Sequence, residues 1–451
     1  MENNTRPTPQ QPARPRTRRS NSLTVKMLFI GAIMLLLLIP GRMIMNLIED
    51  RESMMREAQE EVARMWGGVQ HLTGPVLTIP YAVTTTDKKG NSETIRGTLS
   101  LLPEELDVAG HIDCEQRRRG FYDTNVYTTD LVLSGTFDLP ADLLVRTSGT
   151  RIDWSAAKVA VGISDLRGIE ESIEIGFDDH QLATATETEH PCFEVGVSAP
   201  VDLTAWTAVP DKRMRFSIPL KIKGSGGLHI VPAGNANRIR FSADCPTPNF
   251  CGNFLPSTRE VTGSGFSAEW KVVAQNREYP QKLWGSNFRH PIRQSELGVN
   301  LLIPVTQYQQ ATRSVKYAAL VILLTFCGVF FVEMTRRRNI HAFQYLLVGL
   351  ALILFYSLLV SISEHLDFGL AYFIAAAMTV SLITLYMYGI VRQKATAACI
   401  GGLLTLLYAY IYVLLRLEVF ALLAGSIGLF VILAFTMRYS LKMEWTRPEE
   451  R

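Results

Sequence analysis

The chain has 451 residues, with 45 basic and 42 acidic side chains, and is long enough for two or three domains. This near balance of charge argues against a nucleic-acid binder, which needs an excess of basic side chains. Apolar residues are concentrated at both ends of the chain, whereas the middle has the composition of a polar globular domain. The distribution predicts an integral membrane protein with a large soluble insert.

The amino-terminal segment, residues 1–23, is polar and basic, and we expect it to be a disordered cytoplasmic tail. An apolar run follows from Val25, and no small-residue cleavage site comes after it. Instead, a charged helical pattern continues. We therefore expect residues 24–46 to form an uncleaved signal anchor, the first transmembrane helix, and residues 47–66 to form a helical stalk.

The middle of the chain, residues 67–313, consists of short stretches with strand character that are bounded by Gly, Pro, Asn and Asp. β-Branched and aromatic residues recur in these stretches, and helical periodicity is weak. The pattern predicts an all-β, sandwich-like domain. Because the helical stalk tethers the start of this domain to the first transmembrane helix, and its end runs straight into the second, we expect it to lie close to the membrane.

The carboxyl-terminal part contains five apolar segments of about 20 residues, each long enough to cross the hydrocarbon as a helix. Basic side chains fall on alternate connections, as is typical of cytoplasmic loops. With the first transmembrane helix, the pattern predicts six spans, both termini in the cytoplasm, and residues 47–313 outside, which in a bacterial inner membrane means the periplasm. We expect a five-helix bundle over residues 314–438 and a cytoplasmic tail over 439–451. The five segments lie near residues 315–334, 343–362, 368–391, 396–415 and 419–437.

Charged side chains near these segments fall in the connections. Counted from the basic cluster that begins at Arg336, Glu364 and His365 come about one turn beyond the outer hydrocarbon boundary. No Asp, Glu, Lys, Arg or His lies near the midplane of the five segments, which argues against an ion-driven transporter. The candidate outer-face interaction site comprises Glu364, His365, Asp367, Arg416 and Glu418.

Four cysteines lie in the predicted periplasmic domain. Cys245 and Cys251 enclose a loop with two prolines, and a disulfide between them is favoured over two free thiols. A metal site remains open, but the spacing is wider than in a zinc hook and no His lies nearby in sequence, so we expect no bound metal. Cys114 with Cys192 would be a second disulfide.

Two further pairs have alternative interpretations. Asp165 and Arg167 would form a structural pair that fixes a turn at a strand end, or else bind an anionic ligand. Glu364 and His365 would cap a helix end, or else bind metal or relay protons. The chain has no nucleophile-and-base signature, so the sequence predicts neither an enzyme nor a cofactor.

Several long stretches are distinctive, among them "WGGVQHLTGPVLTIPY", "RRRGFYDTNVY", "VGISDLRGI" and "HAFQYLLVGLALILFYSLLVSISEHLDFGLAYFIAA". Almost from end to end, the chain resembles the CreD inner-membrane proteins, also called cell envelope integrity or colicin-tolerance proteins. The resemblance implies a polytopic inner-membrane protein with effects on envelope integrity, colicin tolerance and responses to β-lactams. It implies no catalytic residues.

Our first functional hypothesis is therefore a non-enzymatic inner-membrane protein that contributes to envelope integrity or an envelope-stress response through its membrane-tethered periplasmic domain. Its partners would be the lipid bilayer and an envelope protein, lipid or glycan. An alternative is a transporter or lipid-handling protein, which an apolar groove in the β domain would favour. A third is a membrane enzyme that acts on a lipid or cell-wall substrate, with Glu364 and His365 as base and acid.

Overall fold

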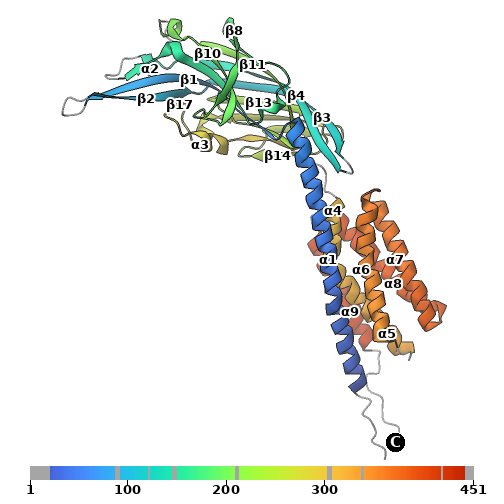
Figure 1. The fold of residues 1–451 in the computed structure, drawn as a ribbon. Helices are drawn as coiled ribbons and strands as arrows, with labels where there is room; N and C mark the ends of the chain where they lie inside the picture. Colours follow the sequence, from blue (N-terminus) through green and yellow to red (C-terminus); the bar gives the residue numbers. More distant parts are fainter. Residues whose placement is uncertain are drawn as a thin grey trace, which may run out of the picture. The chain divides into compact units, whose positions relative to one another are not determined.

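The computed structural model divides the chain into two compact units (Figure 1), a helical unit of Met1–Ser53 with Val305–Arg451 and a β unit of Met54–Pro304. Helix α1 (Asn21–Trp66) contributes to both units. Most of the two predicted tails, and Glu418, lie outside the described residues. The structure describes residues 21–86, 92–119, 122–144, 150–208, 213–301, 307–336, 340–417 and 420–441.

The helical unit is built from α1 and a bundle of carboxyl-terminal helices. Within the bundle, α6 packs against α7, α7 against α8, α5 against both α6 and α8, and α9 against α8. Leu37 of α1 is buried and lies beside Gly349 of α6, where the missing side chain makes room for it. The bundle helices are α4 (Gln307–Lys316), α5 (Ala318–Arg336), α6 (Ala342–Ser363), α7 (Phe368–Val391), α8 (Lys394–Arg416) and α9 (Ala421–Ser440).

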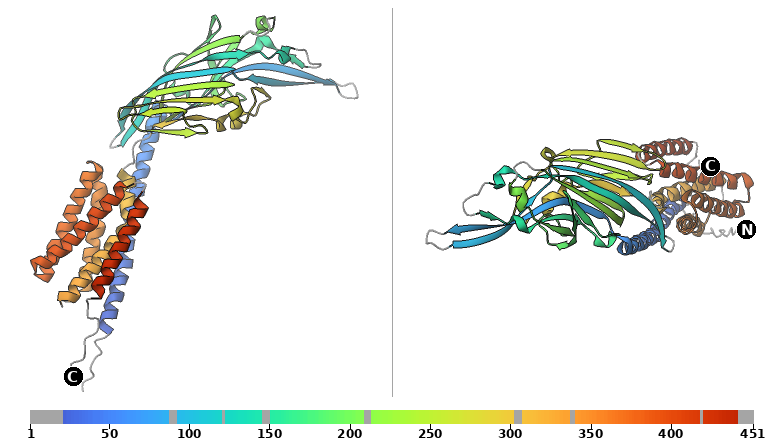
Figure 2. Two further views of the ribbon diagram at one scale, coloured as in Figure 1. Left: turned by 180° about the vertical axis from the view of Figure 1, so that it is seen from behind. Right: turned by 90° about the horizontal axis from the view of Figure 1, so that it is seen from above.

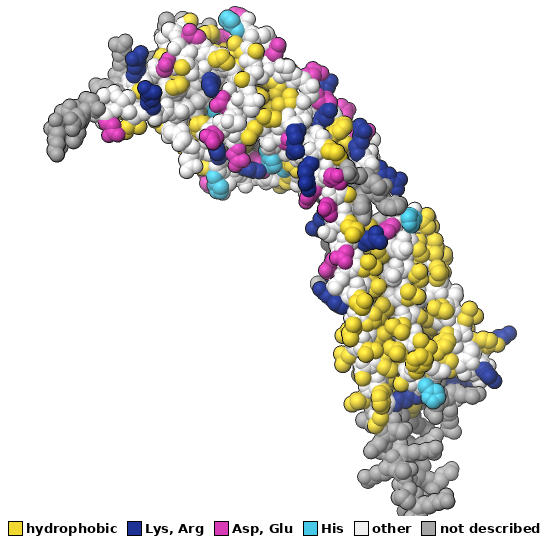
Figure 3. Space-filling model, viewed as in Figure 1, with side chains coloured by type: hydrophobic (Ala, Val, Ile, Leu, Met, Phe, Trp, Pro, Cys, Tyr) yellow, Lys and Arg dark blue, Asp and Glu magenta, His cyan; other side chains and the backbone are white. Residues whose placement is uncertain are grey.

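The outer surface of the helical unit is apolar. Figure 3 shows hydrophobic side chains gathered over these helices, and large ones such as Phe373 and Leu385 are exposed. Helices that are apolar all round are typical of membrane spans. Within the described part of the chain, five helices are long and apolar enough to cross a membrane, namely α1, α5, α6, α7 and α8, and the apolar part of α9, Leu423–Arg438, is shorter.

Aromatic side chains fill the space between α6, α7 and α8. The ring of Phe355 lies 4.5 Å from that of Tyr408 and 5.4 Å from that of Tyr372, measured between centroids. The hydroxyl of Tyr372 donates a hydrogen bond to the backbone oxygen of Tyr408 at 2.8 Å. These contacts stabilise the three helices against one another, since aromatic pairs combine a large buried area with a specific geometry.

The described residues of the β unit form two sheets. In the described residues of the larger sheet ten strands are paired, and β1 runs parallel to β12. Figure 2 shows the long ribbon of β1 and β2 extending beyond the other strands. The strand order is β14 (Pro248–Gly252), β18 (Leu297–Leu301), β12 (Gly227–Ile230), β1 (Gln70–Thr86), β6 (Ala157–Ile163), β10 (Val195–Val201) and β9 (Ala185–Thr188), with β2 (Ser92–Leu101) on β1, β5 (Thr150–Ile152) on β1 and β17 (Lys282–Trp284) on β2.

The smaller sheet has eight strands within the described residues. Buried and exposed positions alternate along its strand β11, as the sequence pattern of a half-buried strand requires. Strand β3 runs parallel to β13, and its other neighbour β4 is antiparallel. The order is β15 (Thr258–Val261), β16 (Phe266–Val273), β13 (Ala236–Ala243), β3 (Glu105–Arg119), β4 (Tyr122–Asp138), β11 (Arg213–Ser225), β7 (Glu174–Phe177) and β8 (His180–Ala183).

One hydrophobic core joins the two sheets. It contains Leu77 and Val159 from the larger sheet together with Ile218 and Trp270 from the smaller one. The β-rich region is therefore a two-layer unit with mixed parallel and antiparallel pairing, which strand patterns alone do not predict. Short helices also lie in this unit: α2 (Ala141–Leu144), α3 (Arg289–Gln294), and the 3-10 turns η1 (Trp154–Ala156), η2 (Leu166–Gly168), η3 (Thr204–Ala208) and η4 (Ala274–Asn276).

Candidate functional site

The larger sheet brings chemically reactive side chains together on one face. His71 of β1 lies directly opposite His229 of β12. On the far side of β12, His229 lies opposite Gly298 of β18, and Gly298 lies opposite Cys251 of β14. Residues opposite each other on adjacent strands point to the same face. Cys251, His229 and His71 therefore form a row, and Gly298 places no side chain between the first two.

A carboxylate completes this group. Glu296 lies two positions before Gly298 and so falls on the same face, with Oε2 2.9 Å from Nδ1 of His71. The two imidazole rings stack with their centroids 4.8 Å apart, and Sγ of Cys251 lies 3.9 Å from Nδ1 of His229. We call His71, His229, Cys251 and Glu296 the histidine cluster.

The electrostatics of the histidine cluster follow from burial and from its own charges. Burial lowers the pKa of His229, and the neighbouring His71 lowers it further. Burial acts to raise the pKa of Glu296, but its hydrogen bond with His71 and the positive groups around it hold the pKa below its usual range. Burial raises the pKa of the Cys251 thiol. Neutral imidazole, carboxylate and, once it has lost its proton, the thiol are all donor types that bind transition metals.

The disulfide differs from the predicted one. Cys114 and Cys245 are joined, with Cα atoms 5.9 Å apart, because the parallel neighbours β3 and β13 carry them to the same end of the smaller sheet. The predicted Cys245–Cys251 bridge is wrong, since Cys251 lies in the larger sheet and is a free thiol. The suggested pairing of Cys114 with Cys192 is wrong as well, because Cys192 is also free.

Asp165 and Arg167, the candidate structural pair, lie beside the end of α1. Two hydrogen bonds join them, from Nε to Oδ1 at 2.9 Å and from Nη2 to Oδ2 at 2.8 Å. Asp165 also accepts from the backbone N–H of Gly68 at 3.0 Å, and Arg167 donates to the carbonyl oxygen of Arg64 at 2.8 Å. The hydrogen bond from Arg167 lowers the pKa of Asp165 to about 2. We call this pair and its two backbone contacts the α1 clamp.

The last residue of α1 strengthens the same attachment. The indole N–H of Trp66 donates to the carbonyl oxygen of Tyr127 at 3.3 Å. The cationic groups of Arg117 and Lys223 lie 4.7 and 4.8 Å from the centre of the Trp66 ring. Cations over an indole face are attracted by its electrons, so the end of α1 is held by hydrogen bonds and by cation–π contacts.

Glu364, a member of the candidate outer-face site, joins three helices of the helical unit. It follows α6 directly and accepts a hydrogen bond from the hydroxyl of Tyr308 on α4 at 3.2 Å. Its carboxylate also lies 3.6 Å from Nε of Arg51 on α1. His365 is the next residue along the chain and is exposed. The contacts of Glu364 explain a structural role for this acidic residue at a helix end.

The remaining outer-face residues lie at the ends of α7 and α8. Asp367 caps α7 by accepting the backbone N–H of Gly369 at 2.9 Å. Arg416 ends α8 and donates to the hydroxyl of Tyr412 at 3.0 Å, and it is close enough to Asp367 for their charges to interact. The structure thus brings Asp367 and Arg416 together, whereas Glu418 lies outside the described residues.

A second ionic group lies near the other end of α1. Glu333, in the last turns of α5, is buried and forms an ion pair with Lys26 of α1. It also accepts hydrogen bonds from the hydroxyl of Tyr345 at 3.0 Å and from the backbone N–H of Ile340 at 3.2 Å. The sequence did not predict these contacts, which join residues far apart in the chain.

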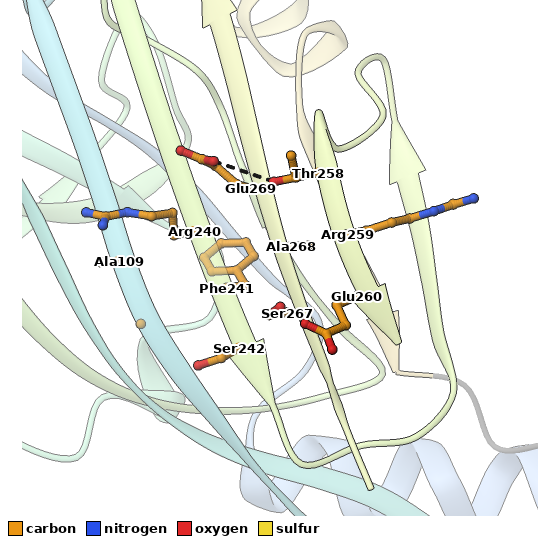
Figure 4. A pocket seen from close by; sticks show the side chains of 11 residues that line it. Ala109, Arg240, Phe241, Ser242, Thr258, Arg259, Glu260, Ser267, Ala268 and Glu269 are labelled. Carbon is orange, nitrogen blue, oxygen red and sulfur yellow. Dashed lines mark hydrogen bonds between the residues drawn. The ribbon is translucent and has the colours of Figure 1, made fainter. Parts of the chain in front are cut away.

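A hollow of about 600 Å³ opens on the smaller sheet, over β3, β13, β15 and β16 (Figure 4). Charged side chains line it, including Arg240, Glu260 and Glu269. Arg240 is paired with Asp107 at 2.8 Å. A lining of this kind suits water and polar groups, so the hollow is not the apolar groove that the lipid-handling alternative requires.

Sequence reasoning missed the histidine cluster because its members are far apart in the chain. We expected no metal partly because no His lies near Cys251 in sequence, whereas strand pairing brings His229 to it. A signal was nevertheless present. In "SELGVNL" the residues Glu296, Gly298 and Asn300 alternate with apolar residues that are buried in the core, so a strand reading would have placed all three on its outer face.

Comparison with known proteins covers both units of the chain. The family described as "Inner membrane protein CreD" matches residues 22–446. The inner membrane protein CreD of Escherichia coli strain K12 is 30% identical over 427 residues, which cover 93% of this chain and 93% of that protein. Together with the several apolar helices, these matches confirm the resemblance found in the sequence, and the chain belongs to the CreD family of multi-pass inner membrane proteins.

Proposed function

We propose that the chain crosses the inner membrane six times, with both termini in the cytoplasm and the β unit in the periplasm. Two ionic groups on α1 support this topology, because they are the right distance apart to bracket a bilayer. Lys26 pairs with Glu333, and Arg51 with Glu364, 25 residues further along the helix. At about 1.5 Å per residue they are separated by about 37 Å along the axis, enough to bracket about 30 Å of hydrocarbon.

The charges at the two ends give this span its direction. If the helices cross the membrane in turn, alternate helix ends lie on the same side as Lys26. Those ends carry basic residues, namely Arg336, Arg392, Lys394 and Arg438. Basic residues accumulate on the cytoplasmic side, so the Lys26 end is cytoplasmic. The Arg51 end is then periplasmic. Both chain connections to the β unit start at this end, since Arg51 and Tyr308 each contact Glu364.

The topology can be tested with alkaline phosphatase, which is active only after export to the oxidising periplasm. A fusion after Gly263, in the β unit, should be active, and a fusion after Gln393, between α7 and α8, should be inactive. Activity after Gln393 would contradict the proposed orientation. A fusion at the end of α9 decides the number of spans, because an odd number would leave it active.

The function that the geometry supports best is non-enzymatic support of the cell envelope, in which the helical unit anchors a periplasmic domain. One observation carries the proposal: the family match extends over both units, so the shared function needs the membrane anchor and the β unit in one chain. The α1 clamp and the Glu364 contacts agree with it. In both, the charged residues form stabilising contacts with helix ends.

A partner would meet the protein at the outer-face residues. His365 and Asp367 are exposed there, and the opposite charges of Asp367 and Arg416 suit an envelope protein, a glycan or a lipid headgroup. Photo-crosslinking in living cells from position His365 would identify the partner, with the exposed Gln393 as the control position at the opposite helix ends.

Protein or glycan adducts that form from His365 and not from Gln393 would support the scaffold or sensor role. Lipid adducts from His365 alone would favour the lipid-handling alternative. Identical adducts from both positions would remove the outer-face site from the proposal. A cell-wall or lipid product that disappears in His365→Ala would instead support the membrane-enzyme alternative.

A further inference from the structure

The histidine cluster differs from an ordinary surface pair of His and carboxylate. Such a pair exists elsewhere in the same unit, where Nε2 of His111 lies 3.3 Å from Asp113 and both side chains are exposed. In the histidine cluster, a second imidazole stacks on His71 and a thiol faces that second ring. A simple ion pair between a His and a carboxylate needs neither the second imidazole nor the thiol.

The hydrogen bonds of His229 determine which of its nitrogens is available. Nε2 lies 3.0 Å from Oδ1 of Asn300, on the same strand face as Glu296. An amide oxygen only accepts, so Nε2 carries the proton and Nδ1 keeps a free lone pair. Nδ1 is the nitrogen that faces Cys251. A metal-binding His is typically held in this way, with its other nitrogen donating to a neighbouring oxygen.

The separations of the donor atoms suit a small metal ion. One ligand atom each from His71, His229 and Glu296 lies within 4.8 Å of the other two. In a tetrahedral zinc site, with bonds of about 2.0 to 2.3 Å, ligand atoms are about 3.3 to 3.8 Å apart. Side-chain rotations that move the ligand atoms about 1 Å closer together would therefore give them the spacing of a zinc site. Glycine at position 298 leaves the space between Cys251 and His229 open for this movement.

We propose that His71, His229 and Glu296 bind a divalent transition metal of the zinc type, with Cys251 as the fourth ligand. Two imidazoles, a carboxylate and a thiolate form a donor set that zinc accepts, and the thiol loses its proton on binding. The set also carries two negative charges, which balance those of the metal.

The position of the site indicates what the metal does. It connects β14, which is at the edge of the larger sheet, with β18, β12 and β1. The chain reaches β14 from β13 of the smaller sheet, and Cys245 on that connection is joined to β3 by the disulfide. The disulfide would therefore hold this connection at Cys245, and the metal would hold it at Cys251. The metal would also fix the edge strand β14, whose exposed edge could otherwise pair with another chain.

The test is metal binding by the full-length protein, purified in detergent without a polyhistidine tag and stripped with a chelator. Zn²⁺ is added back and its stoichiometry measured by mass spectrometry of the metal. Co²⁺ serves as a second probe, because its visible absorption reports thiolate ligation. The variants are H71Q, H229Q, E296Q and C251S. H111Q is the matched control, since it alters a His paired with a carboxylate in the same unit.

We expect one tightly bound Zn²⁺ per chain, a loss of at least about tenfold in affinity for each of H71Q, H229Q and E296Q, and no change for H111Q. With Co²⁺, the thiolate absorption should be present in the unsubstituted chain and absent in C251S. No Zn²⁺ binding by a chain with intact trypsin resistance would overturn the proposal, as would equal binding by H71Q, E296Q and H111Q. Zinc retained at full affinity in C251S would overturn the assignment of the fourth ligand.

Discussion

Replacing Asp165 with Asn removes the charge at the centre of the α1 clamp with almost no change of shape. The carboxylate accepts two hydrogen bonds from the Arg167 guanidinium, and one each from the backbone N–H groups of Arg167 and Gly68. An amide has one accepting oxygen in place of two. Asp165→Asn therefore loses part of this set and leaves the contact of Arg167 with Arg64 without its counter-charge.

The magnitude follows from the pKa of Asp165, which is about 2 instead of the ordinary 3.8. Such a difference corresponds to an upper limit of about 2 kcal/mol in favour of the charged form. Solvent screens part of this interaction, which leaves about 1 kcal/mol. We therefore expect the end of α1 to open about fivefold more often in Asp165→Asn.

Hydrogen–deuterium exchange of the full-length protein in detergent measures this opening directly, because the amide of Gly68 is itself bonded to Asp165. The peptide that contains Gly68 should exchange about fivefold faster in Asp165→Asn. Asp202→Asn is the matched control. Asp202 also holds a local turn, by accepting from the amide of Thr204 at 2.9 Å, but it has no contact with α1 among those described.

The pH dependence has a definite sign. The pKa of Asp165 is lowered on folding. Its carboxylate therefore contributes fully to the stability of the α1 clamp above the unfolded value of 3.8, and this contribution is lost as the pH falls through about 2. After correction for the intrinsic exchange rate, the difference in exchange of the Gly68 peptide between the unsubstituted chain and Asp165→Asn should become smaller as the pH falls over this interval. Equal protection of Gly68 in both chains at neutral pH would refute the assignment of a clamp to Asp165.

Three further predictions concern other parts of the chain. Trp270→Ala should lower the free energy of unfolding of the β unit by about 3 to 5 kcal/mol, because the indole is fully buried and its N–H donates to the carbonyl oxygen of Phe254. Denaturant titration measures this loss, and a loss below about 1 kcal/mol would contradict the packing of Trp270. Thiol labelling of the denatured, unreduced chain should count four free cysteines, and C114S should raise the count by exposing Cys245, whereas C251S should lower it. Glu364→Gln and Tyr308→Phe should each destabilise the helical unit in thermal unfolding by less than about 1 kcal/mol, since the ion pair with Arg51 is partly exposed; additive effects would show that the two contacts are independent.

Much of the architecture was predictable from local pattern. Apolar segments of membrane length, the change to strand patterns after Trp66 and the long resemblance to the CreD family are all properties of contiguous sequence. The multi-pass membrane character and the family were confirmed for that reason. The number of spans and the periplasmic position of the β unit stay predictions, because they depend on where the bilayer lies along the chain, and the fold alone does not determine this.

The cysteines show where contiguous sequence was misleading. Cys245 and Cys251 are close along the chain, and a local disulfide was the natural inference. The chain passes from one sheet to the other between them, so Cys245 meets Cys114 of a parallel neighbour and Cys251 meets His229. The order of strands in a sheet depends on packing between distant segments, and no local pattern encodes it.

By itself, then, the sequence determined which segments are apolar enough for the membrane, which part forms strands, and to which family the chain belongs. Only the tertiary structure decided which side chains meet. His71, His229, Cys251 and Glu296 come together through the pairing of β14, β18, β12 and β1, and Arg51 meets Glu364 through helix packing. Hydrophobic periodicity specifies which face of an element is buried, whereas the partner of that element is chosen by the packing of the whole core.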